Sequence, residues 1–245
     1  MTGRGFKVIR PLASSSAGNA YLVTDGRFPL LLDCGLSYRE LQKATGYKLT
    51  GLAGCLITHE HKDHCKAAVD ITRAGINTYM SAGTAWALVE ATNRSFAGHR
   101  VKIIRALEQV QIGDWTVLPF DTVHDAAEPL GFLLAARGAK VLYLTDSAYC
   151  RYRFRGLTHI LIECNHAADI LQANVESGAV PAAMRRRVMR SHMSLSTVKG
   201  FLKANDLSQV REIHLIHLSD GNSDAWRFKS EIQAMTGKPV YVAEK

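Results

Sequence analysis

The sequence predicts an α/β fold in which two β-sheets are packed between outer helices. Short β-favouring runs recur along the whole chain, and segments with helical patterns lie between them, an alternation typical of α/β folds. Of the 245 residues, 47% are hydrophobic and 21% are charged, as in an ordinary globular protein and unlike a disordered chain or a coiled coil. Because no repeat or Pro/Gly-rich linker divides the chain, we expect residues 1–245 to form a single domain.

The first third of the chain predicts strands joined by turns, together with two helices. The Ser-rich segment 14–19 (SSSAGN) consists of turn-forming residues and separates the first two strands. The apolar run 54–58 is too short for a helix and is bounded by glycine and polar residues, so we expect a buried strand there. The predicted strands are 7–10, 20–24, 29–33 and 54–58, and the predicted helices are 38–45 and 63–74.

The rest of the chain predicts two hairpins and then alternating strands and helices. Gly113-Asp114 interrupts the segment 110–120, and Arg137-Gly138 interrupts 130–144. Such residue pairs between alternating runs favour tight hairpin turns. Further strands are predicted over 158–163, 213–218 and 239–243, and further helices over 167–176, 194–205 and 224–235.

The composition limits which cellular compartment and which binding partners are expected. No apolar run approaches the roughly 20 residues that span a bilayer, and residues 1–10 lack the apolar stretch of a secretory signal, so we expect a cytoplasmic protein with no membrane partner. The five cysteines include no CxxC pair and are expected to be reduced thiols. The net charge of +8 favours a polyanionic partner such as nucleic acid, although a basic surface without such a partner explains the charge equally well.

The segment 58–64 (THEHKDH) is the part of the sequence that most clearly indicates chemistry. From His59 onward it packs three imidazoles and two carboxylates into six residues at the exit of a predicted strand. On an extended segment His59 and His61 point the same way, whereas Asp63 and His64 fall in the first turn of the next helix and can reach a second point. One segment can therefore supply ligands to two metal ions, and these ligand types favour Zn²⁺, Mn²⁺ or Fe²⁺ over Ca²⁺ or Mg²⁺.

This HxHxDH run resembles the signature of the metallo-β-lactamase superfamily, and the match extends over almost the whole chain. The resemblance implies a four-layer αβ/βα sandwich with two divalent metal ions, Zn²⁺ or Mn²⁺. Asp33 resembles the Asp that steadies the metal loop without binding a metal. The implied first metal site is His59, His61 and His124, the implied second site is Asp63, His64 and His217, and Asp146 is implied to bridge them.

Four further segments resemble the YycJ/WalJ-like branch of DNA-processing enzymes and, more distantly, tRNase Z. They are 14–19, 124–129, 163–166 and 192–196, although Met193 and the Arg-rich segment before it depart from that pattern. The resemblance implies that His192, paired with Glu163, protonates the leaving oxygen, and that Asp63 accepts the proton of the attacking water. Alternatively, His192 is a surface residue before a helix. Relatives of this type often dimerise, so a homodimer is a further expectation.

Residues close to these motifs have weaker implied roles. Asn165 and His166 are implied to support the ligands from behind, or else form an ordinary polar pair at a strand end. Asn19, in the Ser-rich turn, is expected to support the metal cleft in the same way. Cys65 and Cys164 adjoin the motifs, but a small buried thiol is an ordinary core residue, and we do not expect either to bind metal.

Two basic segments are candidates for substrate contact. Residues 151–155 (RYRFR) alternate cations with aromatics, which suits phosphate binding and base stacking and equally suits a solvated edge strand. The cluster that contains Arg187, from residues 185 to 190, either approaches the scissile phosphate or forms a solvated basic turn. The candidate substrate-binding residues are Arg151, Arg153, Arg155 and Arg187.

Together these features predict a phosphodiesterase with two metal ions and a metal-bridged hydroxide as nucleophile. The leading expectation is a nuclease, specifically an exonuclease, acting on DNA or RNA. The same metal pair and His192 would also serve a phosphodiesterase of cyclic nucleotides or cyclic dinucleotides, which is the second expectation. A lactonase or thioesterase is third, because the Glu163 and His192 pair and the basic surface count against it.

Overall fold

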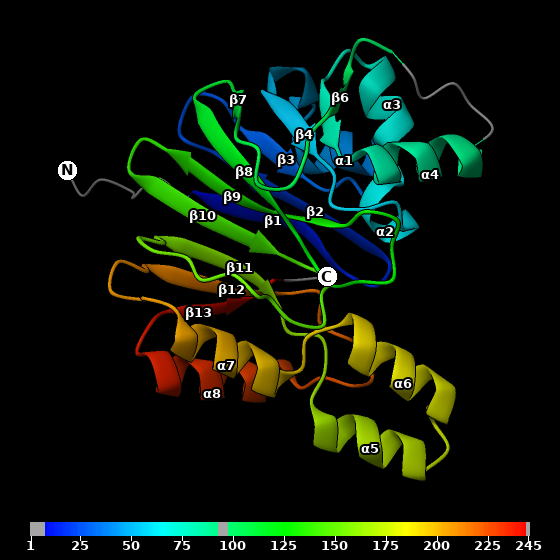
Figure 1. Cartoon of the computed structure of the whole chain (residues 1–245), viewed down its shortest axis with the longest axis vertical. Coiled ribbons are helices and arrows are strands. Elements are labelled where there is room, and N and C mark those ends of the chain that lie inside the picture. Colours follow the sequence, from blue (N-terminus) through cyan, green and yellow to red (C-terminus); the bar gives the residue numbers. More distant parts are fainter. Residues whose placement is uncertain (1–7, 93–97, 244–245) are drawn as a thin grey trace.

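The computed structural model describes residues 8–92 and 98–243, and two β-sheets lie face to face at its centre (Figure 1). The first sheet has six strands in chain order: β1 (Ile9–Ser15), β2 (Gly18–Val23), β3 (Leu30–Leu32), β4 (Gly54–Leu56), β5 (Thr78–Met80) and β6 (Val101–Ile103). The second has seven, in the order β13-β12-β11-β10-β9-β8-β7. Their bounds are β7 (Val110–Ile112), β8 (Trp115–Asp121), β9 (Leu130–Ala136), β10 (Ala139–Leu144), β11 (His159–Glu163), β12 (Glu212–Ile216) and β13 (Val240–Val242).

Three buried apolar layers hold the sheets and helices together. Every second side chain along a strand points into the space between the sheets. Leu30 and Leu32 of β3, for example, pack in the same buried cluster as Tyr143 of β10. The intervening Leu31 faces the opposite way and packs under the helices of the first sheet, as the two-residue period of a strand requires. The helices on that side are α1 (Tyr38–Ala44), α3 (Ala68–Arg73) and α4 (Ala82–Thr92).

The second sheet is covered on its outer face by α7 (Leu195–Ala204) and α8 (Ala225–Thr236). Phe201 of α7 and Phe228 of α8 pack in the same buried cluster as Ile160 and Ile213 of the sheet. The layer order is therefore helix, sheet, sheet, helix, which confirms the predicted four-layer αβ/βα sandwich. Two further helices, α5 (Ala168–Glu176) and α6 (Ala182–Ser191), project beside α7 (Figure 1).

The loops that can form a site follow the carboxyl ends of the strands. Strands β3 and β4 are parallel, and so are β10, β11 and β12. The carboxyl ends of parallel strands meet at one edge of a sheet, which is where α/β proteins commonly bind ligands. The short helix α2 (Lys62–Cys65) begins at that edge, after β4.

Several sequence expectations are confirmed and others are wrong. Both hairpins turn at the predicted residues, and Arg137 and Gly138 both have positive φ, as a type I′ turn requires. The predicted helix 63–74 is instead two helices, because the Ala67 N–H donates to the carbonyl of Cys34. Strand β1 runs through Ser15, so the first hairpin turn is shorter than the predicted segment 14–19.

Five elements lie where the sequence suggested none or a turn: η1 (Leu49–Gly51), β5, α4, β6 and α6. The strands β5 and β6 have only three residues each, which is too short for periodicity to show. The Arg-rich segment is a helix rather than a turn, although only Ser191 of its ten residues is buried. The helix η1 (Leu49–Gly51) is a single turn of 3₁₀ type.

Gly35 lies where the chain that leaves β3 crosses the loop carrying His64. A Cβ atom at this position would lie 1.6 Å from the backbone oxygen of Asp63, a backbone atom that cannot rotate away. We expect Gly35→Ala to lower the free energy of unfolding by about 3 kcal/mol, the upper end of typical overpacking costs. Denaturant unfolding followed by circular dichroism measures it.

The matched control is Gly200→Ala in α7, where an added Cβ meets nothing within 4 Å. Because alanine is the better helix former, this change is expected to raise stability by up to about 1 kcal/mol. Equal stabilities for the two variants would contradict the close packing of Gly35 on the 58–64 loop.

Candidate metal centre

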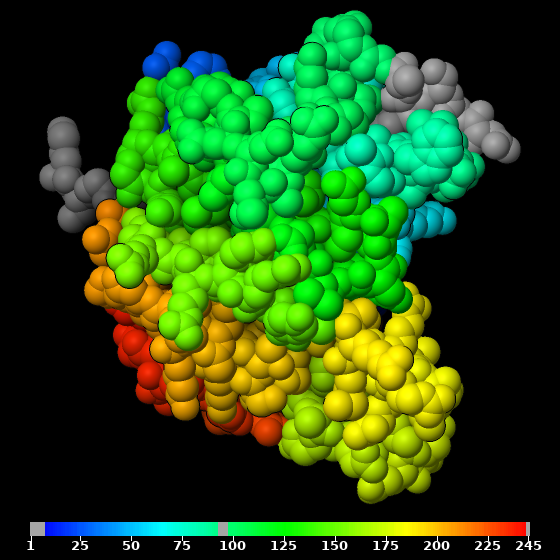
Figure 2. Space-filling view, in the orientation of Figure 1, coloured from blue at the N-terminus to red at the C-terminus, as the bar shows by residue number. Residues whose placement is uncertain are grey.

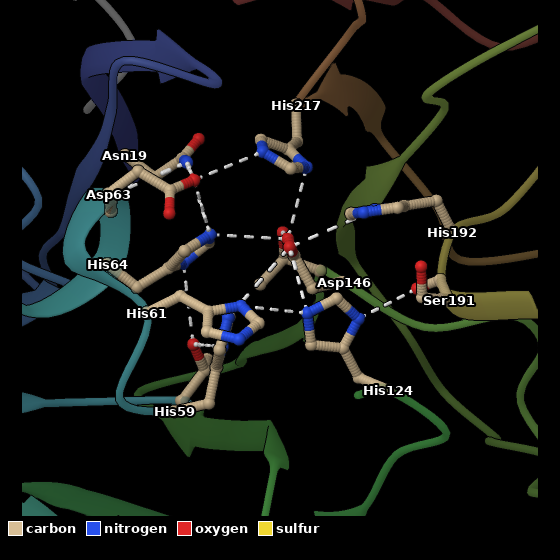
Figure 3. A network of polar contacts seen from close by, with 12 residues as sticks. Asn19, His59, His61, Asp63, His64, His124, Asp146, Ser191, His192 and His217 are labelled. Atoms are coloured by element: carbon tan, nitrogen blue, oxygen red, sulfur yellow. Dashed lines mark hydrogen bonds and ion pairs between the residues drawn. The ribbon is translucent and has the colours of Figure 1, made fainter. Parts of the chain in front are cut away.

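Seven side chains from four segments of the chain converge at the shared edge of the two sheets (Figure 3). His59 and His61 follow β4, Asp63 and His64 belong to α2, and single residues follow three strands of the second sheet. Those three are His124 after β8, Asp146 after β10 and His217 after β12. All seven residues that the sequence suggested as metal ligands are therefore brought together in one place.

The seven side chains form two groups with Asp146 between them. Ligand atoms of His59, His61 and His124 lie within 4.8 Å of one another, and so do those of Asp63, His64 and His217. The two carboxylate oxygens of Asp146 face different groups. Its Oδ2 lies 3.5 Å from Nε2 of His124, whereas its Oδ1 lies 3.3 Å from Nε2 of His64. This arrangement suits a carboxylate that bridges two cations.

Outer contacts hold two of the imidazoles so that the opposite ring nitrogen points inward. His64 Nδ1 lies 2.8 Å from Asp33 Oδ2, and His124 Nδ1 lies 2.8 Å from the carbonyl oxygen of Ser191. The Nε2 atoms of His59 and His217 are buried. Within residues 8–92 and 98–243 that of His59 has no hydrogen-bond partner, whereas that of His217 lies 3.4 Å from Asp63 Oδ2. Buried polar atoms are rarely left unpaired, and imidazole held by such outer contacts is a common metal ligand. The residues thus fit divalent metal ions.

The buried carboxylates of the site need positive charge beside them. Burial alone would lower the pKa of His217, but the carboxylates of Asp146, Asp63 and Glu163 outweigh it and raise that pKa to about 10. Burial would likewise raise the pKa of Asp146, yet the charges of His217 and His64 hold it well below its usual range. Despite burial, the pKa of His64 is raised as well, by the charges of Asp146 and Asp33, so protons on His64 and His217 compensate the carboxylates. Metal ions can take over that compensation, because a ligating imidazole is neutral.

Asp33 lies behind the 58–64 loop and contacts two of its residues. Its Oδ1 accepts from the backbone N–H of Thr58 at 2.8 Å, and its Oδ2 lies beside His64. The hydroxyl of Tyr143, from the opposite sheet, donates to the same Oδ2 at 2.5 Å. Asp33 is completely buried. It therefore links the two sheets and fixes the ring of His64.

The backbone is strained at three positions in the site. Asp33, Asp146 and His217 have φ values of 56°, 35° and 52°, in the left-handed region that residues other than glycine seldom adopt. Each residue follows the end of a strand. Strain of this kind costs on the order of 1–3 kcal/mol for each residue and concentrates at functional sites. Nothing in the sequence indicated this backbone strain.

Glu163 and His192 form a pair beside the two groups. Glu163 is completely buried, and its Oε1 lies 2.5 Å from His192 Nδ1. The backbone N–H groups of Met193 and Ser147 donate to its Oε2, so the carboxylate cannot rotate freely. His192 Nδ1 also lies 3.8 Å from Asp146 Oδ2. Burial lowers the pKa of His192, but the charge of Glu163 outweighs it and raises that pKa above its usual value.

The weaker sequence candidates occupy different places. The side-chain amides of Asn19 and Asn165 donate to the site loops, the first at 3.3 Å to Asp63 Oδ2 and the second at 3.1 Å to the backbone oxygen of His217. His166 is buried, and its Nδ1 has no hydrogen-bond partner among the described residues. Its pKa is lowered to about 4 by burial. The supporting role of His166 stays a prediction.

The candidate arginines separate into two regions. Arg151 pairs with Asp121, and together with Arg153 it lines a groove against α7. Arg155 is exposed on the same loop. Arg187, in contrast, lines a cleft that also includes His124 and Asp125. Substrate contact by all four arginines stays a prediction, but only Arg187 shares a cleft with a candidate metal ligand.

Several residues that shape the site had no individual role in the sequence analysis, although Thr58, Glu60 and Ser14 lie within segments that it singled out. Thr58 bonds to both Asp33 and His59, and its position next to the HxHxDH run was the available signal. Ser14 accepts from the backbone N–H of His217 at 2.9 Å. Glu60 accepts from Ala127 at 2.8 Å and so ties the metal loop to the loop of His124. Nothing in the sequence around Tyr143 indicated its hydrogen bond to Asp33.

Comparison with known proteins identifies the family. A family model described as "Beta-lactamase superfamily domain" matches residues 29–218. The chain belongs to this superfamily. An "Exodeoxyribonuclease YycJ" from Bacillus anthracis is 28% identical over 244 residues, which cover 95% of this chain and 90% of the relative. The expected resemblance to the YycJ/WalJ-like branch is thereby confirmed.

Two solved structures confirm the fold. The metallo-β-lactamase fold protein YhfI from Bacillus subtilis has a TM-score of 0.70 at 17% identity, with 96% of each chain covered. The short form of human tRNase Z has a TM-score of 0.63 at 16% identity, covering 97% of this chain and 96% of the other. Family and relatives together show that the protein is a metal-dependent hydrolase. None of the helices in the ranges 8–92 and 98–243 has the length and hydropathy to cross a membrane.

Asp33→Asn tests how the metal loop is held. The amide keeps the shape but loses the charge beside His64, and its NH₂ group cannot accept a hydrogen bond. We expect metal affinity to fall by about 10–100-fold, as is typical when a residue that orients a ligand is lost. Titration of chelator-treated protein with Zn²⁺ or Mn²⁺ in a calorimeter measures the change. Asp70→Asn, on the exposed face of α3, is the matched control, and an equal affinity for both variants would contradict the role of Asp33.

Proposed function

We propose that this protein is a phosphodiesterase with two divalent metal ions, Zn²⁺ or Mn²⁺, and that it acts as an exonuclease on DNA or RNA. The observation that carries the proposal is the Glu163–His192 pair beside Asp146, with 2.5 Å between the carboxylate and the imidazole. A proton donor at this place suits a poor leaving group such as the oxygen of a sugar. The relative named as an exodeoxyribonuclease, aligned over 95% of this chain, supports the same conclusion.

The first metal ion would be held by His59, His61 and His124 and the second by Asp63, His64 and His217, with Asp146 shared. Two such ions lower the pKa of a bound water and stabilise the charge on the attacking and leaving oxygens. The protein supplies the remaining steps. Asp63, 23% exposed at its side chain, accepts the proton of the attacking water.

His192 donates a proton to the leaving oxygen. The contact between Glu163 and Nδ1 fixes the ring and leaves Nε2 as the donor. Because Glu163 also lies 3.0 Å from His217 Nδ1, one carboxylate orients both the proton donor and a ligand of the second group. A thioesterase has less need of this donor, because a thiolate departs more easily than an alkoxide. The cytoplasmic location and the homodimer stay predictions from the sequence.

The substrate is tested with a panel of phosphodiesters and metal-reconstituted protein. The panel contains bis-p-nitrophenyl phosphate, labelled single- and double-stranded DNA, RNA and cyclic nucleotides, and Asp146→Ala is the control because it removes the shared carboxylate. We expect cleavage of polymer by the wild type and its loss, by at least about 10³-fold, in the control. Turnover of cyclic nucleotides alone would move the function to the second candidate, and no cleavage with either metal would contradict a phosphodiesterase.

His192→Ala tests the proton donor. Hydrolysis of an oligonucleotide is expected to slow by about 10²- to 10⁴-fold, the usual contribution of general acid catalysis. Hydrolysis of bis-p-nitrophenyl phosphate is expected to slow much less, because p-nitrophenolate leaves without protonation. Steady-state kcat on both substrates measures the difference, with His99→Ala on the exposed surface as the control. Equal losses on both substrates would show that His192 has another role.

A further inference from the structure

Helix α6 presents arginines to the solvent with little apolar packing beneath them. Its sequence, AAMRRRVMRS, contains four arginines and no acidic residue. Met184 and Met189 are also exposed, at 52% and 49%. A helix that buries no apolar face is stabilised poorly on its own. This helix is fixed instead at its carboxyl end, where Ser191 is buried and its carbonyl oxygen accepts from His124.

One face of α6 lines a cleft next to the metal centre. Ala183, Arg186, Arg187 and Arg190 are spaced by three and four residues, which places them on the same side of a helix. The opposite wall is formed by Val123, His124 and Asp125. The cleft encloses about 470 Å³, within the range of about 300–1,000 Å³ that ligand sites occupy. In Figure 2 the yellow surface of α6 projects from the body, and a hollow separates it from the green surface above it.

The arginines of this cleft are not equivalent. The Nε atom of Arg187 pairs with Asp125 Oδ2 at 2.8 Å, so Arg187 is held against the loop of His124. The guanidinium groups of Arg186 and Arg190 make no ion pair or hydrogen bond with any residue in 8–92 or 98–243. With Asp125 as the single acidic residue in the lining, the cleft carries a net positive charge. Such a cleft concentrates anions beside it.

The cleft is connected directly to the groups that would perform the reaction. His124, in its wall, is a candidate metal ligand, and the residue that follows α6 is His192. An anion bound along α6 therefore lies next to the reacting phosphate rather than at it. Arg186 and Arg190 are about 6 Å apart along the helix axis, since each residue of a helix adds about 1.5 Å. Two separate guanidinium groups suit an extended anion better than a single phosphate.

From these observations we infer that Arg186 and Arg190 bind the sugar-phosphate backbone of a nucleic-acid strand next to the bond that is cleaved. Arg187, paired with Asp125, positions the wall of the cleft. The inference rests on the proposed function and identifies which part of the protein distinguishes a polymer from a small phosphodiester. The aliphatic stems of these arginines offer apolar surface to the sugars and bases.

The test compares Arg186→Gln/Arg190→Gln with wild-type protein on two substrates, a fluorescent single-stranded oligonucleotide and bis-p-nitrophenyl phosphate. We expect KM for the oligonucleotide to rise about tenfold with kcat unchanged, because phosphate contacts supply binding. The ratio of kcat/KM on the oligonucleotide to kcat/KM on the small ester falls by the same factor. The slope of log Kd against log salt, from fluorescence anisotropy, is expected to decrease by about 0.7 for each lost contact with a single strand.

The matched control is Arg185→Gln. Arg185 lies on the same helix, and its substitution removes one charge, as Arg186→Gln and Arg190→Gln each do alone, but Arg185 does not line the cleft. We expect this variant to keep the wild-type ratio of the two substrates. Equal effects of the control and of each single cleft variant would show that only the general positive charge matters, and would overturn the inference.

The remaining outcomes separate this inference from the proposed function. If the wild type cleaves the oligonucleotide and the double variant does so with the same KM, the inference is wrong and the nuclease proposal stands. If the oligonucleotide is bound but not cleaved, and the double variant binds it more weakly, the inference stands and the nuclease proposal fails. If wild-type protein hydrolyses only the small ester and binds no oligonucleotide, both fail.

Discussion

The rest of the site depends on the buried carboxylate of Asp146, which lies between two sets of imidazoles. Its two oxygens face opposite groups, 3.5 Å from His124 and 3.3 Å from His64. A buried carboxylate is stable only when positive charge compensates it. The surrounding loops therefore have to bring imidazoles, and with them protons or cations, to both of its sides. Asp33 and Glu163 extend this arrangement outward, each holding a histidine in a fixed orientation.

The fold supplies this arrangement at a cost in backbone strain. Positive φ values at Asp33, Asp146 and His217 turn the chain sharply at three strand ends, so that the side chains meet. The strands themselves are buried on both faces and pack into three apolar layers, and that packing offsets the strain. The reactive end of the molecule is thus held by rigid strands, whereas α6 beside it is mostly exposed.

The sequence indicated the residues that meet at the site better than it indicated the elements around them. His59, His61, Asp63 and His64 are close in sequence, so their spacing alone indicated a metal site, and the resemblance located His124, Asp146 and His217. Contacts between distant segments, such as Tyr143 with Asp33, leave no local pattern in the sequence. Helix α6 was missed for a different reason. Helices are recognised by an apolar stripe, and α6 is held instead by contacts at its carboxyl end, where Ser191 is buried and contacts His124.

The most direct test of a shared carboxylate is to locate the metal ions. Anomalous scattering from a crystal of protein reconstituted with Zn²⁺ or Mn²⁺ gives both their number and their positions. Two peaks about 3.5–4 Å apart, one among His59, His61 and His124 and the other among Asp63, His64 and His217, with one oxygen of Asp146 directed at each, are the predicted result. A single peak, or two peaks of which one lies away from Asp146, would contradict the account.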